Sequence, residues 1–148
     1  MGIISEISQK DFAMTLTKWV ATYGVTLLVF LALDFMWLGL VAKGFYRRYL
    51  GSFFSEKVNW LAAFLFYLIF ILGILVFAVL PGFKEASGFK ALGMGMLFGL
   101  VTYATYDLTN LALLKGWPTK VVIVDMAWGT LLTGIVALAG YAFSIWIS

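Results

Sequence analysis

Long apolar runs separated by short polar links dominate the chain. Four such runs cover residues 19–42, 58–80, 89–114 and 121–147. Each exceeds the ~20 residues that a helix needs to cross a bilayer. Because only helices satisfy their own backbone hydrogen bonds in lipid, the pattern predicts four transmembrane helices.

We therefore predict an all-α membrane protein, a four-helix transmembrane bundle with short loops that forms one integral membrane domain over residues 1–148. Residues 1–18 are mildly amphipathic, which fits either a short N-terminal interfacial helix or a frayed start of the first helix. The second run is apolar all round apart from Tyr67, so we assign it to scaffold and lipid contact. In the third run, Gly95 and Gly99 form a GxxxG pair, which lets two helices approach closely.

Composition supports a bilayer protein and excludes several chemistries. Of the 148 residues, 64% are hydrophobic, and the mean hydropathy is +1.03, whereas about half of a soluble chain is apolar. The absence of Cys and His removes the usual ligand sets for haem, zinc and iron–sulfur clusters, and it removes Ser–His catalysis. The net charge of +3 lies mainly in the links, so we expect the lipid bilayer and not a nucleic acid as partner.

The links and the helix ends also suggest how the chain sits in the membrane. Six Lys and Arg residues lie in the links at 43–57 and 115–120, against four on the other side. This excess favours cytoplasmic positions for those two links. Four tryptophans near the ends of the runs are typical of interfacial anchors; they are Trp19, Trp60, Trp117 and Trp146.

Three carboxylates lie inside the apolar runs, namely Asp34, Asp107 and Asp125. Counted from the nearest basic link, at 1.5 Å per residue, their depths are roughly 13, 12 and 8 Å. The first and third runs end on the face where the fourth begins, so all three carboxylates are predicted in one leaflet. Ionisable residues at such a depth are costly and usually mark a functional site.

Polar and aromatic residues accompany these carboxylates at helical spacing. Tyr103, Tyr106, Asp107 and Asn110 recur three and four residues apart and predict one polar stripe, which Thr109 widens. The predicted ligand- or cation-binding residues are Asp34, Asp107, Asp125, Asn110, Tyr103, Tyr106, Thr109, Trp37 and Trp128. No residue is assigned a catalytic role.

Several ligands suit such a pocket. Neighbouring carboxylates do not all ionise cheaply, so at least one is expected to hold a proton unless a cation compensates. Oxygen ligands suit Na⁺, Mg²⁺ or Ca²⁺, and aromatic faces suit a protonated amine. The alternative is structural, with each Asp acting as a buried hydrogen-bond acceptor.

Three segments resemble a known family. LDFMWLG, YATYDLTNLALLKGWP and VDMAWGT, at residues 33–39, 103–118 and 124–130, resemble the bacterial membrane proteins grouped as domain of unknown function 2177. The resemblance implies a multi-pass protein of the bacterial inner membrane. It implies no catalytic residue.

The leading functional hypothesis is a small membrane protein that binds or transports a proton, a cation, or a small cationic or lipid-like ligand. Four helices provide few walls, so a homodimer is expected as the working unit. The alternatives are a membrane-embedded enzyme that modifies lipid and an accessory subunit of a larger membrane complex. The enzyme is disfavoured because the chain has no recognisable catalytic motif.

Overall fold

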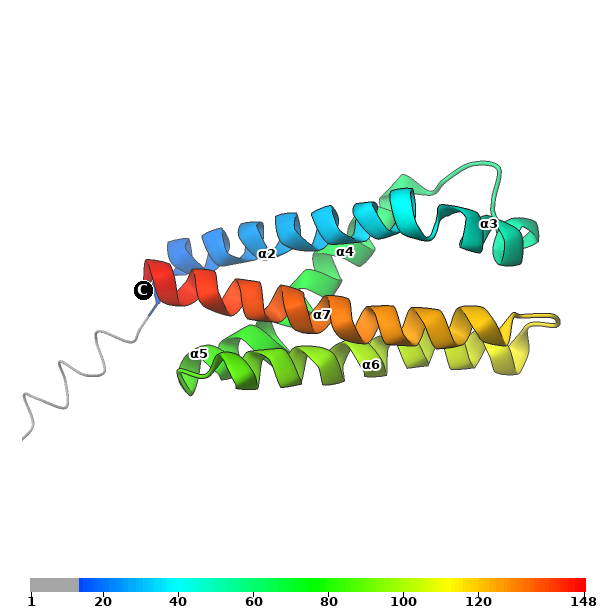
Figure 1. Cartoon of the computed structure of the whole chain (residues 1–148). Coiled ribbons are helices and arrows are strands. Elements are labelled where there is room, and N and C mark those ends of the chain that lie inside the picture. Colours follow the sequence, from blue (N-terminus) through cyan, green and yellow to red (C-terminus); the bar gives the residue numbers. More distant parts are fainter. Residues whose placement is uncertain (1–13) are drawn as a thin grey trace, which may run out of the picture.

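The computed structural model describes residues 14–148, and every regular element within that range is helical (Figure 1). The first rod consists of α2 (Leu16–Met36) and the π-helix η1 (Trp37–Val41); α3 (Lys43–Leu50) and the 3₁₀ turn η2 (Gly51–Phe53) follow. The second rod consists of α4 (Trp60–Ile74), the π-helix η3 (Leu75–Val79) and α5 (Leu80–Lys84), and the last two helices are α6 (Gly88–Leu113) and α7 (Thr119–Ile147). The predicted interfacial helix falls largely on residues outside the described range.

Within residues 14–148, three helical segments are long and apolar enough to cross a membrane, namely Leu16–Val41, Trp60–Lys84 and Thr119–Ile147. The prediction of apolar spanning helices is confirmed for these three. The helix α6 has 26 residues but is not among them, because Asp107 and its polar neighbours lower its hydropathy. The predicted four-helix transmembrane bundle is therefore confirmed only as an all-helical fold with three apolar spans.

Figure 1 shows α2, α7 and α6 lying side by side, with α4 crossing behind them. The start of α2, the α5–α6 turn and the C-terminus lie at one end of the molecule, which we call the terminal end. The helix α3 and the α6–α7 turn lie at the opposite end, which we call the α3 end. The predicted arrangement, with residues 43–57 and 115–120 at the same end, is confirmed.

The most extensive helix contact joins α6 to α7, and small residues make it close. A Cβ atom added at Gly95 would lie 2.6 Å from the Ala137 Cβ atom, and one added at Gly99 would overlap the Gly129 carbonyl oxygen. Only glycine allows the two backbones to approach this closely. The GxxxG pair is thus a packing feature, as predicted.

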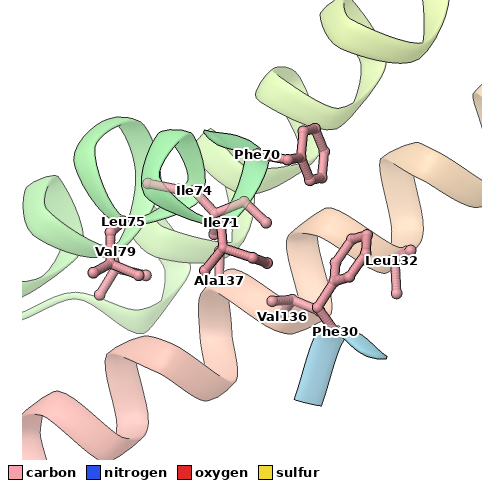
Figure 2. Packing of buried hydrophobic residues seen from close by; sticks show 10 residues of the cluster. Phe30, Phe70, Ile71, Ile74, Leu75, Val79, Leu132, Val136 and Ala137 are labelled. Carbon is pink, nitrogen blue, oxygen red and sulfur yellow. The ribbon is translucent and has the colours of Figure 1, made fainter. Parts of the chain in front are cut away.

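A buried apolar cluster holds α2 and the second rod against α7 (Figure 2). Its ten members are Phe30, Phe70, Ile71, Ile74, Leu75, Ala78, Val79, Leu132, Val136 and Ala137. In lipid, the tight fit of such side chains favours the folded state more than removal from water does. A second, smaller apolar cluster lies at the α3 end and consists of Leu50, Trp117, Val121 and Val122.

The second helical rod continues through Pro81 to Lys84, whereas the sequence predicted that the second run ends at residue 80. The π-helix η3 ends at Val79, immediately before α5 begins, and Pro81 lies in the first turn of α5. A helix tolerates proline in its first turn, where the missing N–H group is not needed for an intrahelical bond. The link at 43–57 was also predicted as a loop, yet residues 43–50 form α3.

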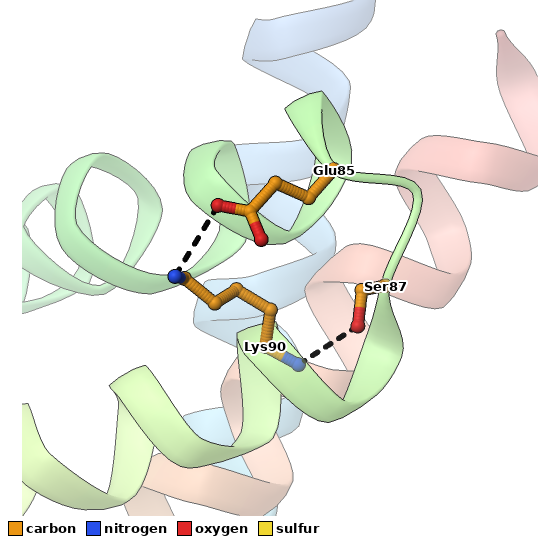
Figure 3. A network of polar contacts seen from close by, with 3 residues as sticks. All are labelled: Glu85, Ser87 and Lys90. Atoms are coloured by element: carbon orange, nitrogen blue, oxygen red, sulfur yellow. Dashed lines mark hydrogen bonds and ion pairs between the residues drawn. The ribbon is translucent and has the colours of Figure 1, made fainter.

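At the terminal end, Ser87 caps α6 by accepting a hydrogen bond from the Lys90 backbone N–H at 3.2 Å (Figure 3). The Lys90 Nζ atom lies 3.2 Å from Glu85 Oε1, which is the one salt bridge found in the described part of the chain. Both side chains are about half exposed, so the pair adds little stability. In the described part of the chain, no charged pair of this kind involves Asp34, Asp107 or Asp125.

Candidate functional site

The register of the α6–α7 contact places two of the predicted carboxylates opposite each other. Steps of four residues pair Gly95 with Ala137, Gly99 with Thr133, and Tyr103 with Gly129. The next step along these antiparallel helices pairs Asp107 with Asp125. The two carboxylates are accordingly within electrostatic range of each other.

Asp34, from α2, is buried and accepts a hydrogen bond from Tyr67 of α4. The Tyr67 hydroxyl donates to Asp34 Oδ2 at 3.1 Å. The Trp128 indole N–H faces the same carboxyl group without forming a hydrogen bond within the described structure. Sequence reasoning assigned Tyr67 to scaffold, although it was the one polar side chain of an otherwise apolar helix.

Asp125, from α7, is partly buried and is held by a short chain of hydrogen bonds. The Tyr46 hydroxyl donates to Asp125 Oδ1, and the Trp37 Nε1–H donates to the Tyr46 hydroxyl at 3.2 Å. Burial raises the pKa of Tyr46, and the hydrogen bond to Asp125 raises it further. Tyr46 therefore keeps its proton and remains a donor to Asp125.

Tyr46 is a site residue that the sequence reasoning missed. It lies on α3, in the segment predicted as a loop. The available signal was the spacing in KGFYRRYL, where Phe45 and Tyr49 are four residues apart, as are Tyr46 and Leu50. Such spacing is typical of an amphipathic helix that packs its aromatic face, and here that face packs on Val121 and its neighbours in α7.

Asp107, from α6, differs from the other two carboxylates. Its relative exposure is 0%, and neither Oδ1 nor Oδ2 has a hydrogen-bond partner among the described residues. A charged carboxylate in that position would lose its hydration without compensation.

The Tyr103 hydroxyl lies close enough to Asp34, Asp107 and Asp125 to interact electrostatically with each of them. The three carboxylates nevertheless differ in their hydrogen bonds: Asp34 accepts from Tyr67 and Asp125 from Tyr46, whereas Asp107 has no partner among the described residues. Within the range that the structure describes, no group of three His, Cys, Asp or Glu side chains is close enough to share a metal ion. The predicted polar site thus appears as three neighbouring positions around one tyrosine.

The two predicted tryptophans lie together. Trp37, from η1, stacks on Trp128, from α7, with ring centroids 4.3 Å apart and an interplanar angle of 9°. Trp37 is the first residue of the π-helix, a kind of segment that is frequent at functional sites. The stacked pair connects the surroundings of two carboxylates, since Trp128 faces Asp34 and Trp37 donates to the tyrosine that is bonded to Asp125.

A cavity of about 520 Å³ opens beside Asp125. Its lining residues come from α4, α6 and α7 and are mainly aromatic: Phe66, Phe70, Thr102, Tyr103, Tyr106 and Asp125. Asp125 is the one charged side chain in this lining. The cavity is of the size that proteins use for small organic ligands.

Two predicted site residues lie farther from this cavity. Thr109 is exposed, and its hydroxyl donates to the Thr105 carbonyl of its own helix; two residues beyond Asp107, it points to another side of α6. Asn110 lines a second cavity, of about 260 Å³, nearer the α6–α7 turn. Trp117, which was predicted as an interfacial anchor, lines this second cavity as well and is buried.

The chain belongs to a family of predicted membrane proteins, DUF2177, since the sequence model of that family matches residues 19–142. The resemblance found in the three sequence segments is thereby confirmed. No curated protein matches the chain, and no solved structure matches it.

Proposed function

We propose that this protein crosses the bacterial cytoplasmic membrane with four helices and binds a lipophilic organic cation in the cavity beside Asp125. The observation that carries the proposal is the chemistry of that cavity, which has four aromatic rings and one carboxylate in its lining. Aromatic faces attract cations, and a carboxylate in a low-dielectric site attracts them strongly.

The proposal treats α6 as the fourth span. Its 26 residues are about 39 Å long, which exceeds the ~30 Å hydrocarbon core. Its most costly group, Asp107, is covered by other helices. The hydroxyl groups of its exposed threonines form hydrogen bonds within the helix: Thr105 Oγ1 donates to the Val101 carbonyl at 2.7 Å, and Thr109 donates to the Thr105 carbonyl. Such bonds lower the cost of polar side chains in lipid.

An organic cation suits the site better than a metal ion does. A metal ion needs several oxygen ligands at close range, and the described residues bring no three acidic ligands together. An organic cation needs one counter-charge and a large apolar contact area. The ligand would enter from the bilayer, because the cavity wall includes Phe66 and Tyr106, which are 49% and 58% exposed.

The test is calorimetric binding of tetraphenylphosphonium to the purified protein in detergent. This probe is lipophilic and permanently charged, and triphenylphosphine oxide serves as its neutral counterpart. We expect saturable binding of the cation and at least about tenfold weaker binding of the neutral compound, which is roughly 1.4 kcal/mol. Equal binding of the two compounds would contradict the proposal.

The matched variants are Asp125→Asn and Glu56→Gln. Both remove one negative charge from the α3 end, but Glu56 is exposed in the link and lines neither cavity. Asp125→Asn should lose at least about tenfold in affinity, whereas Glu56→Gln should bind as the wild type does. Thermal unfolding in detergent checks that both variants are folded. Wild-type affinity in a folded Asp125→Asn protein would show that the carboxylate does not hold the cation.

A further inference from the structure

Asp107, like Asp34, lies outside the lining of the proposed cation site. It is completely covered and has no hydrogen-bond donor within the described structure, whereas Asp34 and Asp125 each accept a hydrogen bond from a tyrosine. A carboxylate in such a place is far cheaper to keep as the neutral acid. Without a cation nearby, Asp107 therefore holds its proton.

The groups that face Asp107 are acids and phenols. Three titratable side chains interact electrostatically with Asp107 itself, namely Asp125 of α7 and Tyr103 and Tyr106 of α6. Tyr103 and Asp125 in turn interact with the next titratable neighbours, which are Tyr46 of α3, Asp34 of α2 and Tyr67 of α4. The π-helix η3, which also packs on α6, carries only apolar side chains. In α5 the one charged residue is Lys84, at the terminal end of the molecule.

The basic side chains of the α3 end face elsewhere. Lys43 and Arg47 line a separate cavity with Leu50, and Arg48 and Lys120 lie over the Tyr49 ring. Among the described residues no positive charge is placed beside Asp107, so we infer that a ligand supplies it.

We propose that binding of the cation beside Asp125 releases the proton held by Asp107, so that the protein exchanges one proton for one lipophilic cation. This inference rests on the proposed function. In the exchange, the O–H bond of Asp107 breaks, its electron pair stays on the carboxylate, and the proton passes to water. The cation is bound unchanged, and nothing is oxidised or reduced. The pair then carries two negative charges, which the bound cation offsets in part.

The second cavity provides a route for the proton. Tyr106 lines both cavities and is within electrostatic range of Asp107 and Asp125. Asn110, which lines the second cavity, lies one helical turn beyond Asp107 towards the α6–α7 turn. These two polar side chains lead from the buried acid towards the α3 end of the molecule, where water is available.

The experiment is calorimetric binding of tetraphenylphosphonium between about pH 5 and about pH 9, a range in which ordinary exposed carboxyl groups are already ionised. The probe does not titrate, so every proton released comes from the protein. By linkage, if binding releases a proton, then affinity rises with pH, by up to about tenfold per pH unit. Measurements in buffers with different ionisation enthalpies count the protons directly. We expect close to one proton per cation for the wild type at the steepest point.

The decisive variant is Asp107→Asn, which keeps the shape of the side chain and cannot release a proton. We expect it to bind the cation with an affinity that is flat over the same pH range and with no proton release. Asp107→Ser replaces it if the Asn variant does not fold. Glu85→Gln, at the terminal end, should keep the wild-type pH profile.

The outcomes separate the two proposals. Binding that is absent from the wild type at every pH overturns the proposed function itself. Binding that needs Asp125 but is independent of pH in the wild type leaves that function standing and overturns the exchange. An equal pH slope in the wild type and in Asp107→Asn also overturns it, because the proton would then come from another group.

Discussion

In both halves of the α6–α7 contact, facing residues recur every four positions along each helix. The two halves differ in the kinds of side chain that face each other at those positions. Towards the terminal end, Gly95 and Gly99 lie against Ala137 and Thr133, so the backbones almost touch. Towards the α3 end, the same four-residue step brings Tyr103 to Gly129 and then opposes two carboxylates. Small side chains close one half, whereas aromatic and acidic side chains keep the other half open enough for a cavity.

The packed half sets the geometry of the polar half. In lipid, helices associate through close packing and hydrogen bonds, and the glycine contacts supply that packing. Once Gly99 is seated against Gly129, the depth of Asp107 relative to Asp125 follows from the helical rise. The carboxylates do not need to attract each other to be brought together.

The largest effect should come from Gly99→Leu in the packed half. The added side chain would overlap the Gly129 carbonyl, and a Cβ atom would already lie 2.7 Å from the Thr133 Cβ atom. Because backbone atoms cannot move aside cheaply, we expect a loss of more than about 3 kcal/mol in unfolding free energy. Gly93→Leu is the control on the same helix, since no heavy atom lies within 4 Å of a Cβ there. Equal thermal midpoints for the two variants in detergent would contradict the close contact.

Much of this packed half could be predicted from the sequence. Apolar runs of more than 20 residues define helices whose bounds differ from the predicted ones by a few residues, and GxxxG marks the close face. The exceptions have local causes. A π-helix carries the second rod through Pro81, and α3 has eight residues, too few to form a clear period inside a charged link.

A smaller effect should come from Tyr67→Phe, which tests the polar half. This change removes the hydroxyl that donates to Asp34 and leaves a buried carboxyl group without that partner. We expect a loss of about 1–3 kcal/mol in unfolding free energy. Tyr141→Phe is the control, because in the described structure the hydroxyl of Tyr141 makes no hydrogen bond; it should be neutral. Equal losses for both variants would show that the Tyr67–Asp34 bond does not contribute to stability.

The polar half was harder to predict because depth along a helix and direction around it are separate quantities. Counting residues from the basic links gave the common level of the carboxylates, in agreement with the register of Asp107 and Asp125. The partners depend on how each helix is rotated, which the packing of neighbours decides. Tyr67 and Tyr46 were therefore missed as donors, although a lone tyrosine in an apolar helix was a usable signal.

The smallest effect on the unfolding free energy should come from Asp107→Asn. This variant tests whether Asp107, which has no hydrogen-bond partner among the described residues, differs in its contribution to stability from Asp34, which accepts a hydrogen bond from Tyr67. No hydrogen bond within the described residues is lost, and the shape of the side chain is kept, so the unfolding free energy should change by less than about 1 kcal/mol. Thr133→Val is the matched change in the packed half, because the Thr133 Oγ1 atom is also buried without a partner there; it should be neutral or slightly stabilising. Thermal unfolding in detergent measures both changes. A loss of several kcal/mol in Asp107→Asn alone would mean that the Asp107 carboxyl group has a structural role as a hydrogen-bonding group. Its proton would then stabilise the fold and would not be released when a cation binds.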